Sequence, residues 1–227
     1  MHIQALQLQT KHLVEQKAFY HTVLGLPLLA ETATSFSVQA GTTRLSFQAT
    51  EQEVHYHIAF TIPSNKFAMA KAWISQRMAL LLTKKAEDEI LFPNLNARSF
   101  YFGDAADNIL EYMVHTGLDN QTAGDFGPED VLRVSEIGLP VEDVPALAEQ
   151  LEKQLGIVSY PTANEVSAGF GYLGDIFGQL VVVKAGRPWL PGETMPAIVS
   201  PVHVVIEGQH EQQLQLSPYP YTITAQA

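Results

Sequence analysis

The first hydrophobic and polar positions of the chain alternate, which predicts a strand with one buried face. In ALQLQT, Leu6 and Leu8 fall on one side and Gln7 falls on the other. A polar stretch over residues 10–23 is compatible with a helix, which Gly25 would end. Three short strand patterns follow, LPLLAETA, SFSVQAG and TRLSFQAT. The first unit is therefore predicted to run strand, helix and three strands.

A second unit repeats this order. HYHIAFTIP is a strand pattern with Ile58 and Phe60 on one face, and Phe67, Ala70 and Ile74 then recur at helical spacing. Further strands are expected at about 79–83, 89–92, 97–102 and 109–115, one of which could be a loop.

The third unit follows a break in the pattern. Residues 116–130, TGLDNQTAGDFGPED, are rich in Gly, Asp and Asn and lack a hydrophobic period, so they are predicted to form a linker. EIGLPV is then a strand pattern, and Asp143 and Gly156 mark the start and the end of a helix.

The spacing within the first and third units agrees. Leu8 precedes Leu24 by sixteen residues, and Leu139 precedes Leu155 by the same number, which indicates an internal repeat. A fourth unit from Pro196 keeps the strand patterns VHVVIEG, LQLSPY and YTITAQA, but its helix is missing or vestigial.

The composition is that of a packed globular protein, and it narrows the partners. The 227 residues are 46% hydrophobic and 16% charged, enough for one large or two smaller domains. A net charge of −11 argues against nucleic acid and anionic membranes, because both require clustered Lys and Arg. The absence of cysteine excludes disulfides, thiolate metal sites and cysteine nucleophiles.

The sequence shows no pattern that would direct the chain to a membrane. Its first residues, MHIQALQLQTKHLVEQ, lack the basic start and apolar run of a secretory signal. The longest apolar runs, MALLL and LVVV, are far too short to cross a bilayer. A soluble cytoplasmic protein is therefore expected.

Three segments carry a resemblance to a known superfamily. IQALQLQTKHLVEQKAFYHTVLGL, with its FY-x-x-VLGL ending, resembles the opening of vicinal-oxygen-chelate proteins. YFGDAADNILEYMV, in which an aspartate turn leads into an Asn-x-x-Glu strand, is similar to their second hallmark, and GYLGDIFGQLVVV resembles a later copy. The superfamily includes glyoxalase I, extradiol dioxygenases, bleomycin-resistance proteins and fosfomycin-resistance enzymes. The resemblance therefore indicates a fold rather than one reaction.

The resemblance implies an α+β fold of paired βαβββ modules, each pair forming a cup-shaped mixed sheet around a ligand or metal ion. Residues 1–115 would hold the first pair, with modules at about 1–50 and 54–115. Residues 116–130 would be the linker, and residues 131–227 a second, degenerate pair whose last module is reduced. A homodimer is expected by analogy only.

The resemblance also implies where metal ligands would lie. Members that use a metal take one ligand from the first strand and one from the last strand of each module of a pair. The first-strand position of the first module, fourteen residues before the phenylalanine of the FY motif, is Ala5, whose methyl group cannot bind metal. The corresponding positions of the second module are His57 and Glu111, which can both coordinate an ion. The last-strand position of the first module falls near Ser46 or Gln48.

The second half offers a poorer set of ligands. The resemblance places Glu136 at its first-strand position and Val182 at the position that corresponds to Glu111. His203 is the one nitrogen ligand nearby. These residues argue against a metal ion in this half and for a structural role.

The first half supplies two ligands, whereas catalytic sites usually take three from the protein. Six further side chains are candidates to face the cup: His55, Gln7, Gln48, Arg98, Tyr101 and His115. A shift of two residues along a strand moves a side chain by about 6.6 Å, so His55 or Gln7 would need a bulge or another register to reach the ion. His57 and Glu111 could equally be a hydrogen-bonded pair at the base of a metal-free pocket.

Two functional hypotheses stay open at this point. In the first, the N-terminal cup binds a small molecule beside an incomplete metal site. In the alternative, a divalent ion at His57 and Glu111 supports a lyase or ring-cleaving dioxygenase reaction, and Glu111 also acts as a base. The ion would be Fe, Mn, Ni or Zn, or there would be none. Whether the chain is an enzyme is left open, as is its substrate.

Overall fold

The hydrophobic patterns along the chain correspond to a series of strands and three α-helices among the described residues. The computed structural model describes residues 1–160, 166–208 and 210–227. The strands are β1 (Ile3–Thr10), β2 (Leu28–Glu31), β3 (Ser35–Ala40), β4 (Thr43–Ala49), β5 (His57–Thr61), β6 (Leu80–Leu81), β7 (Ile90–Phe92), β8 (Ala97–Gly103), β9 (Ile109–His115), β10 (Arg133–Val141), β11 (Phe170–Asp175), β12 (Gly178–Lys184), β13 (Val202–Glu207), β14 (Gln212–Gln215) and β15 (Tyr221–Gln226). The helices are α1 (Leu13–Lys17), α2 (Phe67–Ser75) and α3 (Val144–Leu155), with short turns of other helix types at η1 (Ala18–Val23), η2 (Pro93–Leu95) and η3 (Pro128–Asp130).

The predicted order of elements within each unit is confirmed. Unit one comprises β1 to β4, unit two β5 to β9, unit three β10 to β12, and unit four β13 to β15. In unit three, Asp143 caps α3 by accepting a hydrogen bond from the backbone N–H of Ala146 at 3.0 Å, and Gly156 ends the helix with a positive φ. In unit four, no helix lies among the described residues between β13 and β14.

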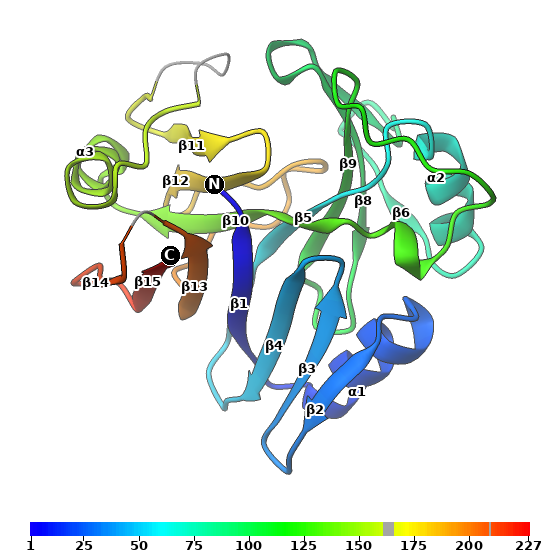
Figure 1. Cartoon of the computed structure of the whole chain (residues 1–227), viewed down its shortest axis with the longest axis horizontal. Helices are drawn as coiled ribbons and strands as arrows, with labels where there is room; N and C mark the ends of the chain where they lie inside the picture. Colours follow the sequence, from blue (N-terminus) through cyan, green and yellow to red (C-terminus); the bar gives the residue numbers. More distant parts are fainter. Residues whose placement is uncertain (161–165, 209) are drawn as a thin grey trace.

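The strands form two mixed sheets whose membership differs from the prediction. Sheet A has the order β14-β15-β13-β1-β4-β3-β2, and sheet B has the order β11-β12-β10-β5-β9-β8-β6, with β7 also on β8 (Figure 1). Sheet A therefore joins units one and four, and sheet B joins units two and three. The predicted pairing of unit one with two and of three with four is wrong. The first strands pair across the halves instead, β1 antiparallel to β13 and β5 antiparallel to β10.

The predicted linker has a different role in consequence. Residues 116–130 connect β9 to β10 within sheet B, and they do not separate two cups. The segment is held by the fully buried Lys66, whose ammonium group donates hydrogen bonds to the backbone carbonyls of Ala123, Gly124 and Asp125 at 2.6–2.9 Å. This crossover fixes where β10 enters the sheet.

The two sheets touch where β10 passes the turn between β3 and β4. The Thr43 hydroxyl donates to the carbonyl of Ile3 at 2.7 Å and accepts from the N–H of Val134 at 3.1 Å. Gly41 is required in the same turn, because it has a positive φ of 59° and a Cβ there would lie 1.9 Å from the carbonyl oxygen of Leu132. The start of β10, a strand of sheet B, is thereby attached to sheet A.

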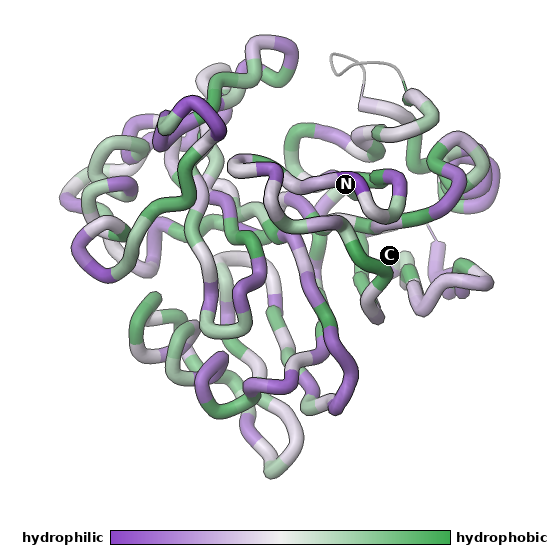
Figure 2. The backbone as a smooth tube through the Cα atoms, turned by 180° about the vertical axis from the view of Figure 1, so that it is seen from behind, coloured by the Kyte–Doolittle hydropathy of each residue, from purple (hydrophilic) through white to green (hydrophobic). Residues whose placement is uncertain are grey.

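The helices cover the outer face of each sheet and leave the inner faces to other side chains. α1 packs on sheet A, while α2 and α3 pack on sheet B (Figure 1). One continuous core of buried apolar residues lies between the helices and both sheets. Figure 2 shows hydrophobic and hydrophilic positions interspersed along the chain, and the burial of side chains along β1 alternates. The inner face of sheet A is largely polar, whereas that of sheet B carries a separate apolar cluster.

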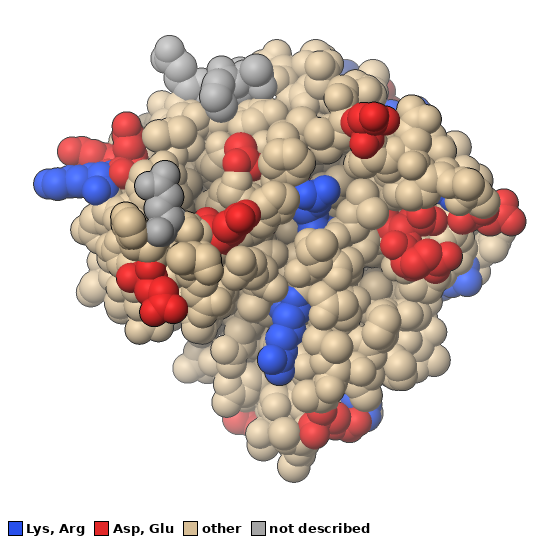
Figure 3. Space-filling view, in the orientation of Figure 1, with Lys and Arg blue, Asp and Glu red and all other residues tan. Residues whose placement is uncertain are grey.

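The surface reflects the net charge of −11. In Figure 3, acidic side chains gather mainly toward the edges of the visible face, and basic ones are fewer and scattered. Within the described ranges, no helix has the length and apolar character that crossing a membrane requires.

A candidate metal centre in sheet B

His57 begins β5 and points to the inner face of sheet B. Its neighbours Ile58 and Phe60 lie in the core beneath the helices, and strand alternation sends His57 and Ala59 to the opposite face. The His57 side chain is only 7% exposed. The expected inward orientation of His57 is therefore observed.

Glu111 reaches the same face from β9, which runs parallel to β5. In the turn before β9, the Asp104 carboxylate accepts hydrogen bonds from the backbone and the side-chain amide of Asn108, at 3.0 and 2.8 Å. The Asn108 side-chain oxygen accepts the backbone N–H of Tyr56 at 2.9 Å. These bonds hold the starts of β5 and β9 together, which places Glu111 beside His57.

Glu136 joins them from β10, the first strand of unit three. The register between β10 and β5 shifts between Val134 and Glu136, which is a β-bulge. Val134 and Ile137 both lie in the helix-side core, so the bulge changes the alternation and turns Glu136 inward. Glu136 is 2% exposed.

These three side chains form a compact buried cluster. The Nε2 atom of His57 lies 3.4 Å from Oε2 of Glu111 and 3.7 Å from Oε2 of Glu136. One ligand atom from each residue lies within 4.8 Å of the other two, and this is the one such group found among the described residues. Nδ1 of His57 and Oε1 of both glutamates find no hydrogen-bond partner within that part of the chain. Buried polar atoms without partners are costly, so the cluster calls for a ligand.

The electrostatics of the cluster point the same way. Burial, together with the neighbouring Glu136, raises the pKa of Glu111 from 4.5 to about 7. Burial raises the pKa of Glu136 to about 8. Burial lowers the pKa of His57, and the nearby Glu111 carboxylate offsets part of that change. Two carboxylates this close cannot both stay charged without a proton or a cation between them.

The donor set fits a divalent metal ion. A neutral imidazole and two carboxylates are ligands that Zn, Fe, Mn and Ni accept, and three protein ligands with an open position are typical of catalytic metal sites. Gln179 on β12 adds a further donor, since it pairs in register with Glu136, is 1% exposed, and leaves its Oε1 without a partner among the described residues. His57, Glu111 and Glu136 would hold the ion, with Gln179 beside them.

Gln179 was missed by the sequence analysis, which assigned the neighbouring ligand position to Val182. In the structure Val182 packs in the helix-side core, while Val181 faces inward opposite Gly138. The apolar run LVVV carries no signal for which of its residues faces the cup. The predicted inward position of Val182 is therefore wrong by one residue along β12, because Val181 faces inward instead.

Two aromatic side chains, those of Tyr101 and Trp189, lie close to the His57 ring. The Tyr101 ring lies 6.4 Å from the His57 ring, and the Trp189 ring lies 5.0 Å from it. Tyr101 was predicted to face the cup, and it does. Trp189 was not singled out, because it lies outside any strand, on the segment between β12 and β13.

Three other predicted candidates lie away from the cluster. Gln7 and Gln48 belong to sheet A, where the Gln7 side-chain amide donates to the Gln48 carbonyl at 3.4 Å. They cannot complete the centre, because unit one does not share a sheet with His57. His55 precedes β5, and its backbone N–H donates to the Ser200 hydroxyl at 3.0 Å.

Arg98 and His115 also lie outside the cluster. Arg98 points to the helix side of β8, where its guanidinium pairs with Glu89 at 2.6 Å and lies 4.2 Å from the Phe67 ring centroid. The prediction that Arg98 faces the cup is therefore wrong, because strand alternation places its side chain on the opposite face of the sheet. His115 is buried at the end of β9, with Nδ1 3.2 Å from the carbonyl of Leu95.

Sheet A carries a structural counterpart of the centre with different residues. By strand register, His203 and Thr224 stand where sheet B has His57 and Glu111, and Ala5 stands in place of the third ligand. His203 Nε2 lies 3.0 Å from the Thr224 hydroxyl. A hydroxyl and a methyl group replace the two carboxylates, so this sheet lacks the charge that attracts a cation.

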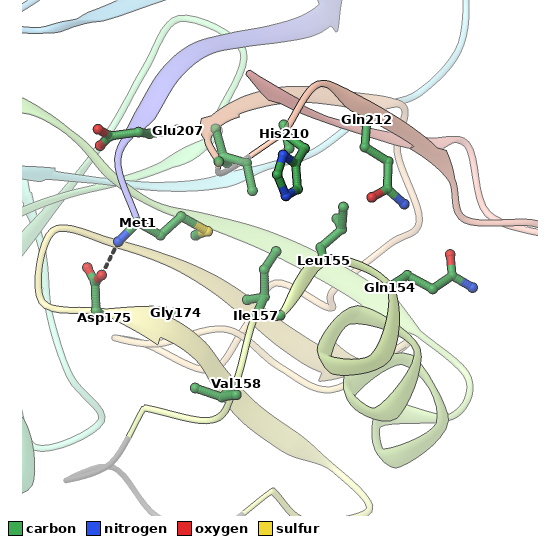
Figure 4. Close-up of a pocket in the computed structure, with 14 residues that line it drawn as sticks. Met1, Gln154, Leu155, Ile157, Val158, Gly174, Asp175, Glu207, His210 and Gln212 are labelled. Atoms are coloured by element: carbon green, nitrogen blue, oxygen red, sulfur yellow. Dashed lines mark hydrogen bonds and ion pairs between the residues drawn. The ribbon is translucent and has the colours of Figure 1, made fainter. Parts of the chain in front are cut away.

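Two further hollows lie outside the centre. A groove of about 410 Å³ on the inner face of sheet A is lined by Gln7, Arg44, Ser46 and His203, among others. A hollow of about 770 Å³ lies between the end of α3, the β11–β12 turn and β13. Figure 4 shows the amino group of Met1 paired with Asp175 at one side of this second hollow.

Glu136 was placed at a ligand position by the sequence analysis, but a metal in the second half was argued against. That expectation treated each half as a separate cup, whereas Glu136 lies beside His57 and Glu111 in one sheet. Ligands from units two and three meet in one sheet, and strand pairing over this sequence distance leaves no local signal. The repeat spacing did locate Glu136 itself.

Comparison with known proteins supports the fold and gives no information about the reaction. Neither a protein-family model nor a curated protein matches this chain. A Bacillus subtilis structure, described provisionally as a dioxygenase, matches 99% of this chain and 85% of its own length, with a TM-score of 0.65 and 15% identity. A lactoylglutathione lyase from Agrobacterium tumefaciens matches 51% of this chain and 96% of its own length, with a TM-score of 0.42 and 17% identity.

A third structure, a glyoxalase/bleomycin resistance protein/dioxygenase from Alicyclobacillus acidocaldarius, matches 50% of this chain and 90% of its own length, with a TM-score of 0.40 and 19% identity. The two half-length matches carry no argument here. The full-length match shows the fold: the α+β architecture of cupped βαβββ modules expected from the vicinal-oxygen-chelate resemblance is confirmed.

Proposed function

We propose that this chain is a metal-dependent enzyme that catalyses proton transfer on a small substrate with two neighbouring oxygen atoms. The observation that carries the proposal is the buried cluster of His57, Glu111 and Glu136, whose ligand atoms lie within 4.8 Å of one another. The third ligand raises the count from the two expected to the three that catalytic sites usually have. The hypothesis of an incomplete metal site loses its main support for that reason.

The residues of the cluster would have different roles in the reaction. His57, with a lowered pKa, is neutral near pH 7 and offers a ring nitrogen as a ligand. A bound divalent ion would supply Lewis-acid polarisation of a substrate oxygen. In the metal-free protein the pKa values of Glu111 and Glu136 are about 7 and 8. With the ion bound, Glu111 would accept and return the substrate proton through a carboxylate oxygen that does not hold the ion. The apolar side chains around them exclude water.

The donor set favours proton transfer over oxygen activation. Non-haem iron oxygenases use two histidines and one carboxylate. This centre has one histidine and two carboxylates. A carboxylate that holds the ion through one oxygen keeps its other oxygen to accept a proton. A ring-cleaving dioxygenase is the alternative, and the provisional description of the Bacillus subtilis structure is its support.

The experiment loads metal-free protein separately with Zn(II), Mn(II), Ni(II) and Fe(II). Exchange of the carbon-bound hydrogens of a 2-hydroxy ketone with deuterated water is then followed by NMR, and oxygen uptake is followed with a catechol. We expect exchange that Glu111→Gln lowers by about a hundredfold, which is the low end of what a general base contributes. Oxygen uptake without exchange would favour the dioxygenase. Neither signal with any metal would contradict an enzymatic role.

A binding function is the second candidate, and the open groove on sheet A favours it. The groove of about 410 Å³ is lined by both polar and apolar residues, opens to solvent and lies in the other sheet from the His57 cluster. The small-molecule site predicted for the first cup would then lie here, with Arg44 and His203 available to an anionic ligand. A screen of small carboxylates by thermal shift, compared between wild type and Arg44→Ala, tests this role.

A further inference from the structure

The space beside the metal cluster is filled by a side chain of the chain itself. Residues 186–197 connect β12 toward β13, and we call them the Trp189 hairpin. The Trp189 indole lies 5.0 Å from the His57 ring at an angle of 35° and is 8% exposed. The indole therefore lies against the His57 side of the cluster and is itself almost fully buried.

The indole occupies a seat shaped for a flat ring. Its floor is Gly138, where a Cβ would lie 2.7 Å from Cη2 of Trp189, so any larger residue would push the ring away. The indole belongs to a buried cluster of apolar and aromatic side chains that also contains Tyr101, Ile109, Val181 and Val183, with Phe170 and Tyr172 packed against it. A concave apolar space beside a few polar groups is the usual form of a small-molecule site.

The hairpin is built as a unit of its own. The Trp189 N–H donates to the carbonyl of Met195 at 2.9 Å, and the Ala197 N–H donates to the carbonyl of Arg187 at 2.8 Å. These bonds stay inside the hairpin, so it can swing without breaking the ladder of sheet B. Apart from Trp189, most of its side chains are exposed.

Few polar contacts tie the hairpin down. At its tip, Glu193 pairs with Lys84 at 2.6 Å, and both side chains are substantially exposed, so this pair contributes little to holding it. Glu193 also has a positive φ of 54°, an uncommon conformation for its residue type. At the base, Arg187 donates to the carbonyl of Gly169 at 3.2 Å.

We propose that sheet B contains a binding site for a flat, uncharged aromatic ring and that Trp189 is its built-in occupant, which such a ligand displaces. The seat exists whether or not the cluster binds metal. Only the further step, that the displacing ring belongs to the substrate, rests on the proposed function. The hairpin would then act as a plug that keeps the centre closed until an aromatic ligand competes for the seat.

The first test removes the occupant and supplies it in solution. Full-length Trp189→Gly is titrated with indole in the presence of EDTA, and its thermal unfolding is compared with that of the wild type. We expect a midpoint that rises with indole concentration in Trp189→Gly and stays constant in the wild type. Trp73→Ala is the matched control, because Trp73 is half-buried on α2 beneath Arg77 and leaves no enclosed seat.

The second test leaves the hairpin intact. The chain has two tryptophans, so Trp73→Phe makes Trp189 the only source of tryptophan emission. Saturating phenol should shift that emission to the red and increase its quenching by acrylamide, because the indole leaves its seat. Unchanged emission, or a folded Trp189→Gly that indole does not stabilise beyond the wild type, would overturn the proposal. Should Trp189→Gly not fold, the phenol result decides. Loss of metal binding alone would alter neither outcome.

Discussion

At the scale of single residues, Glu136 determines the chemistry of the buried cup. If His57 and Glu111 were the only polar groups there, the neutral imidazole could donate a hydrogen bond to the charged carboxylate. The second carboxylate adds a negative charge that burial makes costly, and it raises the charge on the cluster to a value that a divalent ion neutralises. Glu136 therefore favours a bound cation more strongly than the His57–Glu111 pair does by itself.

The pH dependence of stability in the metal-free protein tests this argument. The pKa values of Glu111 and Glu136 are raised in the folded chain, to about 7 and 8. Their contribution is therefore fully present below about pH 4.5, the value of the unfolded groups, and is lost as pH rises through 7 to 8. In EDTA, we expect the free energy of unfolding to fall by roughly 5 kcal/mol between about pH 5.5 and 8.5, because the two shifts together span about four pKa units in that window at about 1.4 kcal/mol each.

The control for this measurement is Glu136→Gln, followed by urea unfolding at the same two pH values. The variant should lose much of the decline, because Glu111 is then the only carboxylate of the cluster and no like charge lies beside it. Added zinc should restore the wild type at the higher pH. A wild-type decline that Glu136→Gln leaves unchanged would show that other groups cause it.

At the scale of elements, the strands were largely predictable and their phase was not. Period-two alternation located β1, β5 and β9, and Asp143 and Gly156 marked both ends of α3 as expected. Arg98 was wrong because uniformly buried strands such as β8 alternate too weakly to show their inner face. The bulge that turns Glu136 inward leaves no mark in the sequence, since it arises from how β10 meets β5.

The turn before β9 is the element on which the ligand geometry depends. Asn108→Ala would leave the backbone N–H of Tyr56 without its partner and would remove one of the hydrogen bonds that the Asp104 carboxylate accepts. We expect a loss of about 2–3 kcal/mol in the free energy of unfolding, as for other buried hydrogen-bonding groups. Metal affinity should fall about tenfold, as for residues that orient ligands.

Chemical denaturation and metal titration of this variant would be compared with Asn65→Ala. The Asn65 side chain is exposed and donates to the carbonyl of Thr122 at 2.9 Å, so its loss should cost less than about 1 kcal/mol. Equal effects of the two substitutions would refute the role of the turn. A stability loss without a loss of metal affinity would limit that role to folding.

At the scale of the whole molecule, the two halves of the chain exchange their modules. Units one and three match in spacing, as the repeat suggested, yet each pairs with a unit from the other half. The spacing along the chain is a local property and could be predicted. The pairing depends on how β1 meets β13 and how β5 meets β10, which are contacts between distant segments, so the sequence carried no sign of it.

An engineered disulfide tests the pairing directly, because the chain has no cysteine of its own. Ala5 and Val205 are register partners on the antiparallel strands β1 and β13. Their separation should be about 4.5–5.5 Å between Cα atoms, which suits a disulfide. The double variant Ala5→Cys with Val205→Cys should oxidise to a cross-linked chain, seen by non-reducing electrophoresis and peptide mass spectrometry.

The control pair joins units one and two instead, through Ala5→Cys with Ala59→Cys. These positions lie in different sheets, so this variant should stay reduced. Cross-linking of the control in preference to the first pair would restore the pairing predicted from the sequence. It would also remove Glu136 from the metal centre.

Metal content tests the central claim most directly. Wild type, His57→Ala, Glu111→Gln and Glu136→Gln would be loaded with Zn(II) or Mn(II), desalted, and measured by mass spectrometry for bound metal per chain. His203→Ala, the counterpart position in sheet A, is the matched control. We predict about one ion per chain in wild type and His203→Ala, as for a single three-ligand site, and its loss in the other three variants. No retained ion in wild type, or full retention in Glu136→Gln, would contradict the account.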